Sequence, residues 1–179
     1  EKELHEHPAV IGQTLGRVID PATRQVVLPD LPFHLAEIPR AAITACGSAY
    51  YAGYVARYWL EAEARLPVDI DVASELRYRN PPLAEGGLAL LISQSGETAD
   101  TLAALRMLRA SGQHVMSVLN VETSTMARES DVVLGMDAGP EISVASTKAF
   151  TAQLTVLAAL TIAIGQALSL IHISEPTRH

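Results

Sequence analysis

The sequence predicts an α/β fold, a three-layer sandwich built on a five-stranded parallel sheet. About half of the 179 residues are apolar, which is enough to bury one good core in a single domain. After Arg40, short apolar runs alternate with longer stretches of helical periodicity, the pattern of consecutive strand–helix units. The run from Leu88 to Ile92 is almost continuously apolar, as expected for a central strand that helices cover on both faces.

The strands are expected where the apolar runs stop at small or polar residues. Each run has four to eight residues and enough β-branched or aliphatic side chains for a buried strand. The predicted strands are residues 41–45, 68–72, 88–92, 114–119 and 131–135.

Helical patterns fill the intervals between these runs. Ser74 is expected to be the N-cap of a short helix that ends at Tyr78 before Asn80-Pro81-Pro82. Another helix should end at Ser111-Gly112, a common C-terminal signal. The remaining predicted helices cover residues 50–65, 99–110 and 124–129, and a long one starts near Ala145.

The two ends of the chain lack the alternating strand and helix pattern of residues 40–167. Five prolines punctuate residues 1–39, which predicts a helix and an extended connector from a preceding domain. Residues 40–167 form the predicted core domain. Residues 168–179 break the Ala-rich pattern and resemble a translated sequencing-adapter read-through, so we expect a non-native tail.

Composition excludes several classes of function. The net charge of −7 argues against a nucleic-acid surface, which would need clustered Lys and Arg. Cys46 is the single cysteine, so neither a disulfide nor a cysteine-ligated zinc can form within the chain, and a reducing cytoplasm is expected. The His residues lack metal-ligand spacing, so we expect no metal and no cofactor. The longest apolar run, 154–164, falls short of the roughly 20 residues of a membrane span.

Three segments that follow predicted strands are rich in small hydroxyl side chains: 46–49, 93–98 and 143–148. Ligands of open parallel sheets bind at the carboxyl ends of the strands, and a helix N-terminus there offers free N–H groups to a phosphate. Gly96 would let the backbone turn close to the anion, and Glu97 would have to point away from it. The alternative is that these hydroxyls are ordinary N-caps and turn formers. Walker A and G-x-G-x-x-G patterns are missing, so nucleotides and NAD are poor candidates.

Four motifs, in matching order and spacing, carry a resemblance to a known family. Residues 45–48, 73–79, 93–101 and 144–151 resemble the first sugar-isomerase (SIS) subdomain, a flavodoxin-like α/β fold, of the glutamine–fructose-6-phosphate aminotransferase (glucosamine-6-phosphate synthase) family. The opening, residues 2–8, is similar to the junction between that family's glutaminase and isomerase domains. The resemblance extends from Glu1 to about Ala167.

This resemblance implies fructose 6-phosphate as substrate and glucosamine 6-phosphate as product. It implies that Ser93, Gln94, Ser95 and Thr98 contact the phosphate, that Ser48 lies beside it, and that Val144 and Ser146 contact the sugar. Many members carry Thr-Ser where this chain has Ser48-Ala49, so a backbone N–H would replace one hydroxyl contact.

The resemblance also implies partners that this sequence does not include. The family's glutaminase domain supplies ammonia, and its second SIS subdomain and C-terminal tail supply the acid, base and Schiff-base groups. We therefore expect no catalytic residue in this chain, and we expect a homodimer. Cys46 is interpreted as structural and Lys148 as a charge that orders a loop or interface. The apolar helix at 146–166 is expected to pack on the second subdomain or on a dimer mate.

Two alternatives stay open. One is an amino-sugar-phosphate deaminase or isomerase built from two SIS subdomains without a glutaminase domain. The other is a non-enzymatic sugar-phosphate sensor, such as the SIS module of a transcriptional regulator.

Overall fold

The centre of the molecule is a five-stranded sheet in the order β4-β3-β5-β6-β7, with all neighbouring strands parallel. The computed structural model describes residues 2–140 and 146–169. Five strands of the predicted number, direction and approximate position confirm the α/β expectation. The strands are β3 (Ala41–Ala45), β4 (Val68–Val72), β5 (Leu88–Ser93), β6 (His114–Leu119) and β7 (Val132–Gly135).

β5 shows why the sheet is buried on both sides. All its residues are buried, and they alternate between two apolar clusters. Leu88, Leu90 and Ile92 belong to one cluster, whereas Ala89 and Leu91 belong to the other. Because successive strand side chains point to opposite faces, an uninterrupted apolar run requires a cover on each face.

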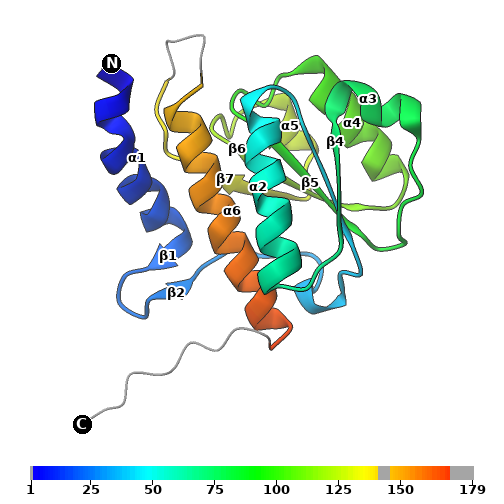
Figure 1. The fold of residues 1–179 in the computed structure, drawn as a ribbon, viewed down its shortest axis with the longest axis horizontal. Coiled ribbons are helices and arrows are strands. Elements are labelled where there is room, and N and C mark those ends of the chain that lie inside the picture. The colour runs from blue at the N-terminus through cyan, green and yellow to red at the C-terminus, as the bar shows by residue number, and fades with distance from the viewer. Residues whose placement is uncertain (1, 141–145, 170–179) are drawn as a thin grey trace.

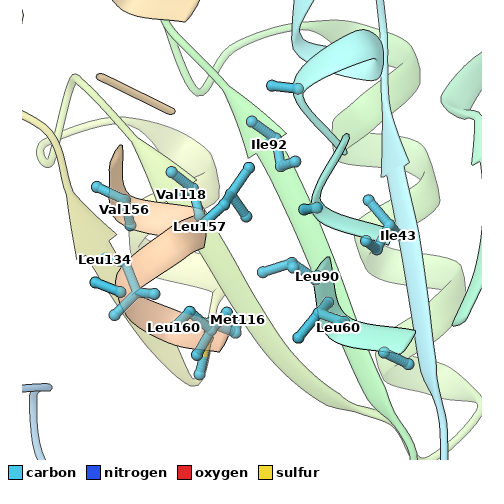
Figure 2. Packing of buried hydrophobic residues seen from close by; sticks show 14 of the residues in the cluster. Ile43, Leu60, Leu90, Ile92, Met116, Val118, Leu134, Val156, Leu157 and Leu160 are labelled. Atoms are coloured by element: carbon cyan, nitrogen blue, oxygen red, sulfur yellow. The ribbon is translucent and has the colours of Figure 1, made fainter. Parts of the chain in front are cut away.

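Two groups of helices provide those covers (Figure 1). α2 (Ser48–Glu63) and α6 (Lys148–Ala167) pack on the first face, with α1 (Lys2–Val18) against α6. In Figure 2, Val156, Leu157 and Leu160 of α6 lie close to the side chains of β6 and β7. The second face is covered by α3 (Ala73–Arg79), α4 (Ala99–Ala110) and α5 (Thr125–Glu129).

α6 has partners within this chain, while its expected packing on a second subdomain or a dimer mate stays a prediction. It contacts α1 and α2, and no residue from Lys148 to Gln166 is exposed. α6 is also the one helix in the described residues that is long and apolar enough to span a membrane, and 56% of that stretch is buried inside the fold. Its apolar composition is therefore explained by packing between helices and sheet.

The N-terminal segment holds more structure than a helix and a connector. Pro8 does not end α1 but lies inside it. The helix leads into a short antiparallel pair, β1 (Ile19–Asp20) and β2 (Gln25–Val26), and a single 3₁₀ turn at Leu35–Glu37 follows. Strands of two residues leave no periodic signal in the sequence, so this pair was not predicted.

The helix boundaries differ from the prediction at several ends. α2 begins at Ser48, two residues early, and α6 begins three residues late, at Lys148. Ser74 is not an N-cap: Val72 holds that position and Ser74 lies inside α3. Ser124 does cap α5, since its hydroxyl accepts from the N–H of Ala127. Of the predicted tail, residues 170–179 lie outside the described residues.

Candidate functional site

The order of the strands opens a crevice between β3 and β5. From β3 the chain passes through α2 to β4 at one edge, and then returns to β5 on the other side of β3. α2 therefore leaves toward one face of the sheet, while α4, which follows β5, leaves toward the other. Open α/β sheets bind ligands at such a switch point, outside the carboxyl ends of the strands.

A cavity of about 500 Å³ occupies this position. It combines the ends of β3 and β5, the first turns of α2 and α4, and the start of α6. Its lining contains hydroxyl, amide and small side chains but no Asp, Glu, Lys or Arg among the described residues. The lining residues are Cys46, Gly47, Ser48, Ala49, Ile92, Ser93, Gln94, Ser95, Thr98, Thr101, Ser146 and Gln153.

The first wall is the turn from β3 into α2. Gly47 is the N-cap of α2 and has a φ of 60°, a conformation that glycine adopts without the steric cost of a Cβ. No side chain caps this end. The first turn of α2, beginning at Ser48, thus lines the cavity with N–H groups that no side chain caps and that carry a partial positive charge.

The second wall is the loop between β5 and α4. The Ser93 hydroxyl accepts from the N–H of Gly96 at 3.0 Å, and the Ser95 hydroxyl accepts from the N–H of Glu97 at 3.2 Å. These bonds fold a tight turn in which Gly96 has a φ of 67°. Each serine uses only an acceptor in this way, so its own proton remains available to a ligand oxygen. Turn formation and ligand binding are therefore compatible roles for the same hydroxyls.

Glu97 turns its carboxylate away from the cavity. Its Oε1 accepts from the backbone N–H of Thr125 at 2.7 Å and from the Thr125 hydroxyl at 3.1 Å. The backbone hydrogen bond is the main reason why the pKa of Glu97 lies below its ordinary value. The negative charge beside the serines is thus held at the start of α5, as a phosphate site requires.

The third wall is the start of α6. Ser146 lines the cavity, whereas Val144, predicted to contact the sugar, lies outside the described residues. Lys148 is almost fully buried and its Nζ pairs with Glu6 of α1 at 2.8 Å. This pair ties the N-terminal helix to the start of α6, which agrees with the ordering role expected of Lys148.

Six of the predicted site residues meet in this one cavity: Ser48, Ser93, Gln94, Ser95, Thr98 and Ser146. Cys46 also lies there, and the Thr101 hydroxyl approaches its Sγ at 3.7 Å. Sequence reasoning missed Thr101 and Gln153. A signal for Gln153 existed, since it is the only polar residue other than threonine between positions 149 and 165.

A second cavity, of about 560 Å³, lies beyond Gln94. Arg17 lines it, which would make it the more obvious anion site. However, the Arg17 guanidinium donates to the carbonyl of Met136 at 3.2 Å and pairs with Glu122. Its charge is therefore compensated within the protein, so the described lining of this cavity offers no free cation to an anion.

Comparison with known proteins agrees with this architecture. The family model described as SIS domain matches residues 34–163. Glutamine–fructose-6-phosphate aminotransferases (isomerizing) from Gluconobacter oxydans and Bradyrhizobium diazoefficiens are 71% and 64% identical to the chain over 167 residues. Those residues are 93% of this chain but only 28% of either relative.

Solved structures give the same result. The C-terminal domain of glucosamine-fructose-6-phosphate aminotransferase from Francisella tularensis superimposes with a TM-score of 0.90 at 38% identity, covering 96% of this chain and 48% of that one. A glucosamine-6-phosphate deaminase from Thermotoga maritima has a TM-score of 0.75 at 23% identity, covering 92% and 48% respectively. The deaminase shares the fold, but a sequence identity of 23% is too low to indicate a shared function.

Proposed function

The chain belongs to the SIS domain family, and on this premise we propose that the cavity between β3 and β5 binds fructose 6-phosphate. One observation carries the proposal: two helices without a side-chain cap begin at a cavity whose other polar groups are hydroxyls and amides. Helix N-termini and hydroxyl donors stabilise a phosphate dianion without any Lys or Arg.

In this proposal the phosphate lies against the loop between β5 and α4. Ser93, Ser95 and Thr98 donate their hydroxyl protons and Gln94 its amide protons, while Ser48 approaches from the start of α2. The sugar extends toward the start of α6, where Ser146 and Val144 contact it. The support is that all of these except Val144 line one cavity.

For the whole protein we propose the conversion of fructose 6-phosphate and glutamine to glucosamine 6-phosphate and glutamate. The support is the shared name of the two relatives described above. The chain spans about 28% of their length, so the glutaminase domain and the second SIS subdomain would supply ammonia and the catalytic groups. We further propose a cytoplasmic homodimer in which residues 1–39 follow the glutaminase domain, residues 40–167 form the SIS subdomain and residues 168–179 are non-native.

The aminotransferase is favoured over a deaminase by sequence identity. At 71% and 64%, the aminotransferases are far more similar to the chain than the deaminase is at 23%.

Calorimetric titration tests the proposed ligand. Fructose 6-phosphate should bind the chain, and fructose should not, because most of the donors serve the phosphate. Ser95→Ala should weaken binding about ten- to a hundredfold, the value of one charge-assisted hydrogen bond. Ser111→Ala, which removes a hydroxyl from the opposite end of α4, serves as the control and should bind normally. Equal binding of fructose and its phosphate would refute the phosphate assignment.

A further inference from the structure

Gln153 has a buried amide oxygen that no hydrogen bond in the described part of the fold uses. It lies on α6 and is 1% exposed. Its Oε1 is enclosed and has no hydrogen-bond partner among the described residues. Most buried side-chain polar atoms in proteins are paired, so an orphaned amide in a core requires a cause.

The surroundings of Gln153 point to a ligand. The residue lines the same cavity as the serine loops, together with the apolar side chains of Ala49 and Ile92. The terminal torsion of a glutamine is broad, so the amide can turn either end toward the cavity at little cost. Its neighbours along α6 are apolar residues or threonines; Thr151, Thr155 and Thr161 donate back to helix carbonyls, so these hydroxyls are already used.

The chemistry of an amide selects the part of the ligand that it can meet. A glutamine side chain offers two donors and an acceptor, which matches a hydroxyl group that also donates and accepts. A phosphate dianion has only acceptors, and it would leave Oε1 unpaired. Gln153 is also five residues into α6 from Lys148, about 7.5 Å along the helix axis, rather than at a helix N-terminus.

We propose that Gln153 is a sugar-recognition residue. Its amide hydrogen-bonds a hydroxyl of the sugar, so that the site binds a sugar phosphate more tightly than inorganic phosphate. This inference rests on the proposed sugar-phosphate site and adds to it a contact for the sugar. A sugar hydroxyl that donates to Oε1 would offset the cost of this buried, unpaired oxygen, which makes the residue specific for a ligand that carries a hydroxyl at that point.

Gln153→Leu provides the test, with Gln166→Leu at the far end of the same helix as control. Fructose 6-phosphate affinity should fall about three- to tenfold in Gln153→Leu, the value of one neutral hydrogen bond. The affinity for inorganic phosphate, measured by competition, should stay the same in both variants. Without ligand, the melting temperature of Gln153→Leu should equal or exceed that of the unaltered chain, because an apolar side chain of similar size replaces an amide whose buried oxygen is unpaired.

Three outcomes overturn the inference, and they are distinguishable. A change of less than twofold in fructose 6-phosphate affinity removes Gln153 from sugar recognition. An equal loss for fructose 6-phosphate and phosphate means that the amide acts on the phosphate or on the shape of the cavity. A lower melting temperature in both Gln153→Leu and the unbranched Gln153→Met means that the amide is structural. If the unaltered chain does not bind fructose 6-phosphate, the proposed function itself fails, and this inference with it.

Discussion

Glu97 carries a negative charge two residues after Ser95, and the fold makes that charge harmless to an anion. Two hydrogen bonds from Thr125 hold the carboxylate at the start of α5. The same bonds connect the loop between β5 and α4 to the next loop along the sheet, so Glu97 also stabilises the turn that presents the serines. The negative charge of Glu97 predicted that its carboxylate points away from a bound phosphate. Its hydrogen-bond partner could not be predicted, because Thr125 is 28 positions further along the chain.

We therefore expect the contribution of the Glu97 carboxylate to stability to be lost in acid. Its pKa is lower in the folded chain than the ordinary value of about 4.3, so its contribution is present above that pH and is lost as the pH falls through the folded pKa. The melting temperature of the unaltered chain should exceed that of Glu97→Gln at pH 7, and the difference should shrink as the pH falls through the folded pKa of Glu97. Glu63→Gln, at an exposed position, should show no such trend. A difference for Glu97→Gln that does not change with pH would contradict the role of the charge.

At the same scale, residue types in the sequence predict most of the candidate site. Serines and Gln94 follow directly after strands, and the carboxyl ends of parallel strands meet at one edge. Gln153 escaped prediction because it lies in a helix interior. Its place in the cavity depends on how α6 crosses the sheet, which is a property of tertiary packing.

At the scale of elements, α2 approaches the sheet closely enough to need a glycine. A Cβ on Gly53 would lie 2.7 Å from Cγ2 of Ile43 and 3.2 Å from Cδ1 of Ile92. Ile43 and Ile92 belong to β3 and β5, the two strands whose ends form the cavity. The absence of a Cβ on Gly53 thus allows the close approach of α2 to β3 and β5 beneath the candidate site.

Gly53→Ala should consequently lower the free energy of unfolding by about 1–3 kcal/mol through overpacking. Gly16→Ala in α1 provides the matched control, since a Cβ built there meets no atom within 4 Å beyond the glycine, its chain neighbours and the nearby backbone of its own helix. That change should raise the free energy of unfolding by about 0.5–1 kcal/mol, the gain in helix propensity. Urea unfolding of both variants measures the difference, and equal stabilities would show that α2 is free to shift.

The elements also show where local patterns stop being informative. Runs of apolar residues placed β3, β4 and β6 at their observed ends, because period and length identify buried strands. The same apolar pattern in α6 predicted a partner outside the chain, and it gave no sign that α1 and α2 also pack on this helix. A pattern reports that a surface must be buried; it does not identify the element that buries it.

At the scale of the whole molecule, the N-terminal helix packs against the core of the fold through α6. Glu6 and His7 of α1 bond to Lys148 and Thr151 of α6 at 2.8 and 3.0 Å. These contacts join positions more than 140 residues apart at α6, the helix that carries Gln153 and follows Ser146. The segment interpreted as a connector thus supports one wall of the candidate site.

Amide NMR tests most directly whether a sugar phosphate binds in the crevice between β3 and β5, as we propose. Fructose 6-phosphate should shift most strongly the backbone amides of residues 47–49 and 94–99, the two turns that meet at the cavity. The alternative location for the anion is the neighbouring cavity, which Arg17 lines. The largest shifts at residues 120–123 and 136–139, with residues 94–99 unperturbed apart from Gln94, would place the ligand there and contradict the account.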